Sequence, residues 1–158
     1  MTASRVAGAG RIEGIVVLLC RLVIGVIFIV AGAGKVGHAP EFAAQIAGFQ
    51  LLPQAVIAPM ALGLPFLEIL LGGCLVVGLF TRAWGWVAVV LLGAFDGAIA
   101  SAVVRGMTVS CGCFGPNDTT VTTWAEVARD AIFVVLALAI ALRAPGALAL
   151  DRRIEPTP

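Results

Sequence analysis

Charged residues are scarce in this chain of 158 residues. They make up 12% of it, whereas 61% of the residues are hydrophobic and the mean hydropathy is +1.09. Soluble domains usually contain about 25% charged and about 45–50% apolar residues. A single small core in water buries too little of its surface to hide so much apolar area. The scarcity of charge therefore excludes an ordinary soluble domain and predicts a protein embedded in lipid.

Other absences narrow the possible functions. The formal net charge is only +1, and no basic stripe or RNA-binding motif occurs, so nothing predicts a nucleic-acid partner. The single histidine, His38, excludes a haem held between two histidines. What remains to be explained is a set of long apolar stretches, a few charges inside them, and four cysteines.

Four apolar stretches are long enough to cross a hydrocarbon core, which takes about 20 helical residues. They run approximately over residues 14–34, 56–80, 83–104 and 124–142. We therefore expect an all-α fold, an integral membrane four-helix bundle over residues 14–144. Residues 1–13 and 145–158 are expected to form cytoplasmic tails.

Two local patterns predict further helical features. Phe42, Ile46 and Phe49 lie at spacings of four and three residues, which gives one apolar helical face. This predicts a short helix in the outer interface, between the first two spans. Thr123 and Glu126 have the spacing of a capping box, which predicts that the last helix starts directly after Thr123.

Basic residues predict the orientation of the bundle. If both termini are cytoplasmic, the inner side carries six of them: Arg5, Arg11, Arg82, Arg143, Arg152 and Arg153. The outer side then carries three: Lys35, Arg105 and Arg129. This excess favours an N-in, C-in protein of the bacterial cytoplasmic membrane, with the loop between the last two helices on the outer face.

That outer loop contains the strongest chemical signal, the segment SCGCFGP at 110–116. Two thiols one residue apart close only a small, strained ring, and the glycine between them has the backbone freedom that this requires. Strained and exposed disulfides tend to be labile or catalytic, and the outer side of a membrane is oxidising. Arg105 and Arg129 flank the loop and would favour a thiolate. We therefore predict that Cys111 and Cys113 cycle between dithiol and disulfide.

Three other interpretations of this pair stay open. It could bind a soft metal such as Cu(I), which prefers thiolates, although no Met or His lies near it. It could be a permanent structural disulfide that shapes the loop, or two unreactive cysteines that only fill space there.

Cys20 and Cys74 are predicted at a similar depth, about 9 Å from the inner boundary at 1.5 Å of rise per residue. They could pair or relay electrons, or they could be ordinary apolar core residues.

Three charged residues fall within the predicted spans: Arg21, Glu68 and Asp96. A charge in hydrocarbon costs several kcal/mol unless it is paired or hydrated. Pairing of Arg21 with Glu68 or Asp96 would neutralise the charges and hold the helices in register. The alternative is a polar pocket that binds a quinone-like headgroup or passes protons.

An ordered set of residues runs nearly end to end along the chain. It comprises Arg21-Leu22, Gly25, Phe28, Ala31-Gly32, Lys35, Leu52-Pro53, Leu64-Pro65, Glu68, Gly72, CGCFG at 111–115, Trp124 and Arg129-Asp130. On these residues the chain resembles the MauE branch of the DoxX-like membrane proteins, which is named for methylamine utilisation.

The resemblance implies a four-helix membrane protein that helps to mature a disulfide-rich periplasmic subunit of methylamine dehydrogenase, beside a thioredoxin-like partner. Other DoxX-like relatives are linked to thiosulfate:quinone oxidoreduction and to thiol stress. By this resemblance Cys111 and Cys113 are the redox pair, while Glu68, Arg129 and Asp130 are polar residues without an assigned role. Nothing in the sequence ties the chain to methylamine itself.

The leading hypothesis is a membrane thiol–disulfide oxidoreductase. The Cys111–Cys113 disulfide would exchange with an extracytoplasmic thioredoxin-like partner or another thiol substrate, with a membrane quinone as candidate electron acceptor, in support of disulfide maturation of exported proteins. DsbB and vitamin K epoxide reductase have a similar architecture, but this chain lacks a second outer cysteine pair.

Three alternatives remain. The protein could be a transmembrane reductant carrier that uses Cys20 and Cys74. It could be a non-catalytic assembly or scaffold subunit, or a permease for a small molecule or metal.

Overall fold

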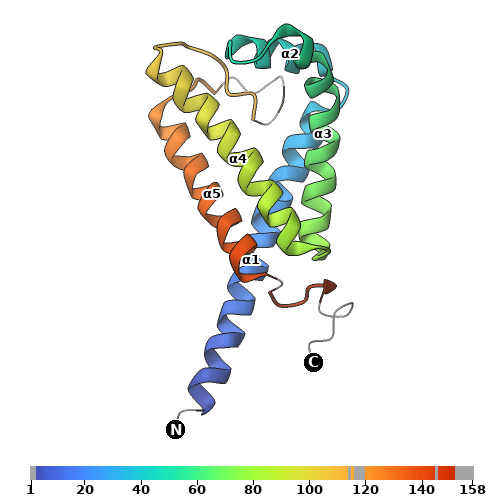
Figure 1. Cartoon of the computed structure of the whole chain (residues 1–158), viewed down its shortest axis with the longest axis vertical. Helices are drawn as coiled ribbons and strands as arrows, with labels where there is room; N and C mark the ends of the chain where they lie inside the picture. The colour runs from blue at the N-terminus through green and yellow to red at the C-terminus, as the bar shows by residue number, and fades with distance from the viewer. Residues whose placement is uncertain (1–2, 114, 116–119, 145, 152–158) are drawn as a thin grey trace.

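The computed structural model describes residues 3–113, 115, 120–144 and 146–151 (Figure 1). The described residues form five α-helices: α1 (Ala3–Lys35), α2 (Ala39–Gly48), α3 (Gln54–Val77), α4 (Thr81–Val104) and α5 (Trp124–Arg143). No strand occurs in them, and Ser110 and Val121 form only an isolated antiparallel bridge. The prediction of an all-α fold is confirmed.

The helix boundaries agree with the expected spans, with one large exception. α1 begins at Ala3, well before residue 14, so most of the predicted N-terminal tail is helical. The short helix predicted between the first two spans is α2. α5 does start after Thr123, but the Thr123 side chain makes no capping hydrogen bond. The Glu126 carboxylate pairs with Arg129 instead, so the predicted capping box does not form.

The long helices pack as two pairs, α1 with α3 and α4 with α5 (Figure 1). α1 also contacts α5, and α3 contacts α4 over a shorter stretch. Within the first pair the backbones approach closely at Gly25 and Gly72. A Cβ atom on either glycine would overlap the carbonyl oxygen of the other. Small residues at such crossings allow the close helix contact that stabilises bundles in lipid.

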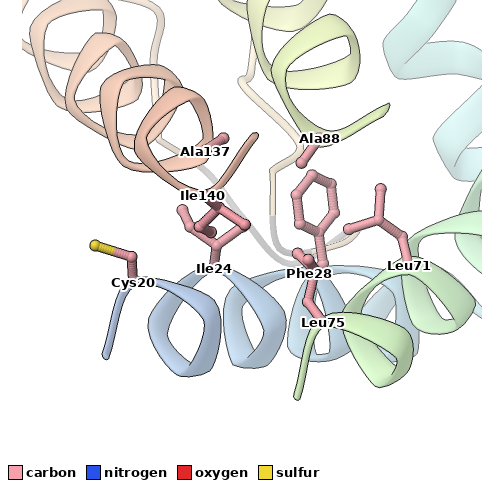
Figure 2. Packing of buried hydrophobic residues seen from close by; sticks show 8 residues of the cluster. All are labelled: Cys20, Ile24, Phe28, Leu71, Leu75, Ala88, Ala137 and Ile140. Carbon is pink, nitrogen blue, oxygen red and sulfur yellow. The ribbon is translucent and has the colours of Figure 1, made fainter. Parts of the chain in front are cut away.

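The main apolar core lies where the four long helices meet (Figure 2). Its buried members are Cys20, Ile24, Phe28, Leu71, Leu75, Ala88, Ala137 and Ile140. Cys20 therefore packs as an apolar core residue, and Cys74 is half-buried. Both are free thiols, and they are not bonded to each other.

Three helical segments in the described part of the chain are long and apolar enough to cross a membrane: Ile12–Lys35, Gln54–Val77 and Thr81–Val104. They expose many large apolar side chains, for example Val26, Leu62 and Val90. Exposure of this apolar surface to water would be unfavourable, whereas the hydrocarbon of a membrane solvates it. α5, the fourth predicted span, is a helix, but Glu126, Arg129 and Asp130 near its start make it too polar to qualify by composition.

The two ends of the bundle differ in what covers them. We call the end with α2 and the loop 105–123 the loop end, and the opposite end with the turn 78–80 and the segment 146–151 the tail end. At the tail end the chain after α5 folds back onto the helices. The Ala147 N–H donates to the Gly14 carbonyl at 2.9 Å, and the Asp151 N–H donates to the Gly78 carbonyl at 3.2 Å. This part of the predicted C-terminal tail is therefore packed against the bundle.

Asp151 caps the start of α4 from a distance of seventy residues in the sequence. Its two carboxylate oxygens accept from the N–H groups of Phe80 at 2.7 Å and Thr81 at 2.8 Å. Burial by itself raises the pKa of Asp151, but these hydrogen bonds and the charge of Arg21 outweigh it and hold the pKa below its usual value. The free N–H groups at a helix start are thus satisfied by a residue beyond the last helix.

Candidate functional site

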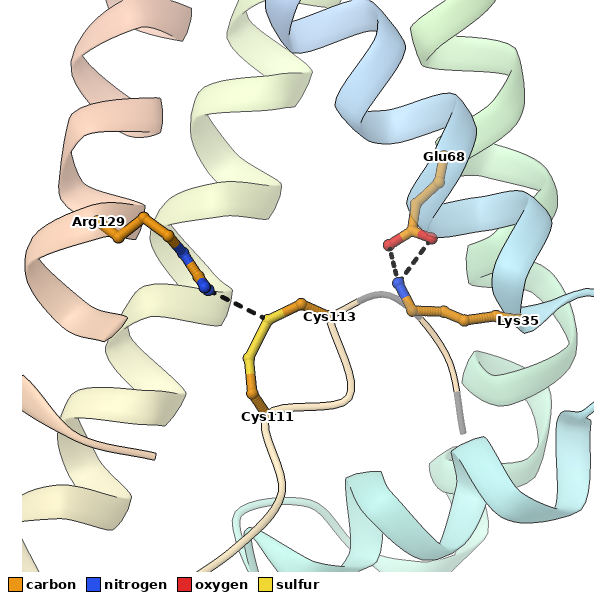
Figure 3. Close-up of polar contacts among 5 residues, drawn as sticks. All are labelled: Lys35, Glu68, Cys111, Cys113 and Arg129. Carbon is orange, nitrogen blue, oxygen red and sulfur yellow. Dashed lines mark hydrogen bonds and ion pairs between the residues drawn. A yellow bond between two sulfur atoms is a disulfide. The ribbon is translucent and has the colours of Figure 1, made fainter. Parts of the chain in front are cut away.

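The cysteine loop is closed by a disulfide between Cys111 and Cys113, whose Cα atoms are 5.4 Å apart (Figure 3). Backbone hydrogen bonds hold the two ends of the loop together. The Cys111 N–H donates to the Thr120 carbonyl at 2.8 Å, and the Thr122 N–H donates to the Val109 carbonyl at 3.0 Å. The predicted pairing within the CGC segment is present in the structure, on a loop tied to the start of α5. Phe114 and the four residues that follow Gly115 lie outside the described residues.

The sequence predicted an exposed disulfide, but Cys111 is buried, with only 2% of its surface exposed. It packs with Phe49, Ile99 and Ala102, because the end of α2 folds over the loop. Gly112 has a positive φ of 64° and lies against the side chain of Gln45 in α2, where any Cβ atom would collide. Cys113 is the more exposed of the two sulfur-bearing residues.

One of the two predicted arginines reaches the disulfide. Arg129 in α5 places its Nη2 3.7 Å from the Cys113 Sγ (Figure 3). Its Nε donates to Asp130 at 3.0 Å. Arg105 instead donates to the carbonyl of Phe49 at 2.6 Å and to that of Ser101 at 3.2 Å. Arg105 therefore ties the end of α2 to the end of α4. Only Arg129 is placed to stabilise a thiolate on Cys113.

Asp130 lies beside the two sulfur atoms. It is 5% exposed, and one carboxylate oxygen lies within 4.8 Å of both Sγ atoms. Two thiolates and a carboxylate would be a plausible ligand set for a metal, but sulfurs joined in a disulfide are not thiolates. The same closeness makes Asp130 a proton acceptor for either cysteine when the disulfide is opened.

Glu68 and Lys35 form a buried ion pair, which the sequence did not predict. Both Glu68 carboxylate oxygens accept from the Lys35 Nζ, at 2.8 and 2.9 Å, and the two side chains are 11% and 3% exposed (Figure 3). The ammonium also lies 5.2 Å from the centre of the Phe42 ring. Lys35 lies at a helix end, where a lysine normally extends toward water. No spacing in the sequence shows that it turns inward.

Arg21 does not pair with Glu68 or Asp96, so that prediction is wrong. It is fully buried, and among the described residues its guanidinium donates to the carbonyl oxygens of Leu75 at 2.9 Å, Val76 at 3.3 Å and Ala147 at 3.3 Å. The carbonyls of the last turn of α3 have no helical partner, so a nearby cation satisfies them. Arg21 is thus a structural residue of the tail end, remote from the cysteine loop.

Asp96 in α4 is half-buried and faces the charge of Asp130. Its Oδ1 atom has no hydrogen-bond partner among the described residues. Asp96 is therefore a polar residue near the candidate site, but it is joined neither to Arg21 nor to Glu68.

A cavity of about 90 Å³ lies between the two helix pairs at the loop end. Its walls are mainly aliphatic and aromatic, and include Phe28, Leu64, Leu92, Phe95 and Phe133. The polar part of the lining brings together the two charged clusters described above: Lys35, Glu68, Cys113, Arg129 and Asp130. The structure thus joins residues from α1, α3, α5 and the cysteine loop around one mostly apolar space.

Comparison with known proteins gives a consistent result. The family described as "Methylamine utilisation protein MauE" matches residues 13–143 of the chain. A methylamine utilization protein MauE of Paracoccus denitrificans is 33% identical over 138 residues, which cover 87% of this chain and 74% of the relative.

Two further MauE proteins are similar to the chain. The one from Paracoccus versutus is 32% identical over 80% of this chain and 69% of its own length. The one from Methylorubrum extorquens is 31% identical over 85% of this chain and 73% of its own length. No solved structure matches the chain. The family match, which includes the helices and the cysteine loop, shows that the chain belongs to the MauE family.

Proposed function

We propose that this protein is a membrane thiol–disulfide oxidoreductase whose Cys111–Cys113 disulfide exchanges with an extracytoplasmic thioredoxin-like protein. The observation that carries the proposal is the placement of this disulfide beside Arg129 and Asp130. A cation next to one sulfur and a carboxylate next to both are the groups that thiol exchange needs, because the reaction moves a negative charge and a proton.

The proposal includes four membrane-crossing helices in the bacterial cytoplasmic membrane, with both termini in the cytoplasm and the cysteine loop outside. α5 is short of the composition expected for a span, but its carboxylate nearest the middle of the helix faces the interior. Asp130 is buried, whereas Ile132, Val135 and Leu142 are exposed. Intramembrane charges are tolerated when they face the interior of a bundle. Lys35 is buried in an ion pair, which leaves fewer free cations on the outer side and favours the same orientation.

The two sulfurs have different roles in the exchange. A thiolate of the partner attacks the Cys111 Sγ, the Cys111–Cys113 bond breaks, and Cys113 leaves as a thiolate beside Arg129. A better-stabilised thiolate leaves faster, which selects Cys113 as the leaving group. Cys113 also lines the cavity, so at least part of its exposure faces that space.

The second half of the exchange completes the electron balance. The second thiol of the partner attacks the mixed disulfide, the partner disulfide forms, and Cys111 is released as a thiol. The partner has then lost two electrons and two protons. The electrons reside on the two cysteines of this chain, one proton is on Cys111, and the other passes by way of the Asp130 carboxylate to water.

Access to Cys111 requires the end of α2 to move, because Phe49 packs over it. Docking of the partner at the loop end would supply the binding energy for this opening. Such a cover would prevent unspecific thiols from reducing the disulfide. The reduced pair then passes its two electrons to a membrane quinone.

The relatives are named for methylamine utilisation, and we propose a role for this chain in the same process. The protein would supply disulfides to an exported protein that needs them, through the thioredoxin-like partner. This assignment follows from the names of the relatives together with the chemistry of the loop.

The proposal is tested by trapping the mixed disulfide in native membranes. Cys113→Ser leaves Cys111 as a single thiol, which attacks the disulfide of the oxidised partner in the reverse of the exchange. The mixed disulfide then persists, because Cys113 is no longer present to displace the partner from Cys111. Mass spectrometry should identify a protein with a thioredoxin-type cysteine pair, linked through one of those cysteines to Cys111. Cys111→Ser should trap far less. A Cys20→Ala, Cys74→Ala variant should exchange at the wild-type rate, because Cys20 is a core residue and the two thiols are not bonded.

Three results would overturn the proposal. Normal oxidation of exported thiol proteins in cells that carry the double variant Cys111→Ser, Cys113→Ser would favour a scaffold subunit. Loss of exchange in the Cys20→Ala, Cys74→Ala variant, while it remains folded, would favour a transmembrane reductant carrier. Protection of the reduced thiols from alkylation only when Cu(I) is present would favour metal binding.

A further inference from the structure

The cavity at the loop end combines features that restrict what it can hold. Most of its wall is apolar, with three phenylalanine rings, Phe28, Phe95 and Phe133. Four charged side chains also border it: Lys35 pairs with Glu68, and Arg129 pairs with Asp130 and, outside the cavity lining, with Glu126. One sulfur atom of the disulfide-bonded pair, that of Cys113, belongs to the same lining.

These features argue against the simplest occupants. A lipid acyl chain would fill the apolar part, but it has no polar atom to accept a hydrogen bond from the ammonium of Lys35, whose other two donors are directed at Glu68. A charged, water-soluble molecule would lose its hydration against aromatic walls. A flat, uncharged ring that carries hydrogen-bond acceptors matches both parts of the wall.

We propose that this cavity binds the headgroup of a lipid-soluble para-quinone, with the ring between the two charged clusters. This inference rests on the proposed function, because it names the site at which the reduced cysteines are reoxidised. An ammonium has three donors, and two of those of Lys35 are directed at Glu68, so one is left for a carbonyl oxygen of the ring. The opposite carbonyl oxygen lies toward Asp130 and Cys113.

The two reduced cysteines supply both electrons that the quinone needs. Cys111 and Cys113 lose two electrons as their S–S bond forms again, and these electrons pass to the quinone through the ring beside Cys113. The proton from Cys111 and one proton from water, relayed by the Asp130 carboxylate, go to the two oxygens. The quinone leaves as the quinol, and no further oxidant or reductant is needed.

The tail end contains no equivalent arrangement among the described residues. Arg21 is as deeply buried as Lys35, but the hydrogen-bond acceptors described for it are carbonyl oxygens, which cannot give or take protons, and the Cys111–Cys113 disulfide lies at the opposite end of the bundle. The combination of a redox-active sulfur, a carboxylate and a shared cation donor occurs only around this cavity in the part of the chain that the structure describes.

Binding is tested first, without any redox reaction. The oxidised wild-type protein in lipid nanodiscs is melted in the presence of decylubiquinone or of decanol, which shares the tail but lacks the ring. A ligand that binds only the folded state raises the melting temperature. We expect a larger rise with decylubiquinone. Equal rises would mean that the cavity accepts only the tail, and would overturn the inference.

A pair of matched tryptophan variants then localises the site. Leu92 lines the cavity, whereas Val90 lies two residues earlier on α4 with 66% of its surface exposed. Leu92→Trp should abolish the extra rise in melting temperature and slow the reduction of decylubiquinone by the dithiol protein about 10-fold or more, because the large side chain fills the space. Val90→Trp should behave like wild type. An unchanged rate in folded Leu92→Trp would place the quinone elsewhere.

The polar contacts are tested with the double variant Lys35→Met, Glu68→Leu, which removes both charges together. Loss of a hydrogen bond from a charged group should weaken quinone binding about 10–100-fold. Disulfide exchange with a thioredoxin-like dithiol protein should stay at the wild-type rate. A double variant that binds decylubiquinone as tightly as wild type would remove these residues from the site.

The two proposals fail in distinguishable ways. If Cys111–Cys113 exchanges with dithiol proteins but decylubiquinone neither binds nor reoxidises the pair, the quinone site is wrong and the proposed function stands. If decylubiquinone binds at Leu92 but the disulfide never exchanges with a dithiol protein, the proposed function is wrong. Thiol titration should show one disulfide formed for each quinone reduced.

Discussion

The loop end and the tail end each bury a cation from α1, and they satisfy it in different ways. At the tail end Arg21 donates to carbonyl oxygens of α3 and of the returning segment 146–151. At the loop end Lys35 donates to the Glu68 carboxylate on the wall of a cavity. A backbone carbonyl cannot change its charge, whereas a carboxylate can take up a proton. The buried cation of the tail end therefore serves to hold the helices together, whereas that of the loop end is paired with a group that can take part in proton transfer.

The largest expected effect is the loss of Arg21. Arg21→Met leaves three carbonyl oxygens without their donor, and we expect the free energy of unfolding to fall by about 3–6 kcal/mol. Thermal melting in detergent measures the loss. Any protein that still folds should exchange disulfides normally, because Arg21 is remote from Cys111. A folded Arg21→Met protein with wild-type melting but defective exchange would contradict the assignment of a structural role to the tail end.

Loss of Lys35 should have a smaller effect on stability. Lys35→Met leaves the Glu68 carboxylate unpaired, which costs several kcal/mol for a buried pair in general. We expect about 2–3 kcal/mol here, since a carboxylate beside a cavity can take up a proton. The double variant Lys35→Met, Glu68→Leu should recover most of this loss. If the double variant melts no higher than Lys35→Met, the pair has a structural role like that of Arg21.

Loss of Arg129 should alter the chemistry more than the fold. Arg129→Gln removes the cation beside the Cys113 Sγ, so the Cys113 thiolate that leaves in the exchange is less stabilised. We expect exchange to slow about 10-fold, a change of about 1.4 kcal/mol, and the Cys113 thiol of the reduced protein to need a higher pH than in wild type for the same rate of alkylation. Stopped-flow measurement of exchange, together with alkylation rates against pH, tests this. The matched control is Arg105→Gln, which breaks a contact to Phe49 and should leave the pH profile unchanged.

The smallest effect is expected at Asp151. Asp151→Ala removes the cap of α4 and should lower the free energy of unfolding by about 1 kcal/mol at neutral pH. The pKa of Asp151 is lower in the folded than in the unfolded protein, so its contribution is present above the unfolded value and disappears as the pH falls through the folded value. The variant should therefore lose less stability than wild type on acidification, as melting curves at several pH values would show.

The cysteine loop shows how far the sequence could be interpreted. The spacing of Cys111 and Cys113 predicted their pairing, and the position of Arg129 predicted a cation nearby. Neither could predict that Cys111 is buried, because its cover comes from Phe49, more than sixty residues earlier. The prediction that Arg105 stabilises a thiolate was wrong, because Arg105 donates to the carbonyl of Phe49, a residue that is also distant in the sequence.

By itself the sequence determined that the chain is embedded in lipid, where its helices lie, and which two cysteines form the pair. These properties depend on composition and on neighbours along the chain, which act locally. Only the tertiary structure decided that Lys35 pairs with Glu68, that Arg21 binds carbonyl oxygens, and that the charged groups surround one cavity. These pairings depend on how each helix is rotated and shifted against the next, and the long-range packing that sets those two quantities has no period in the sequence.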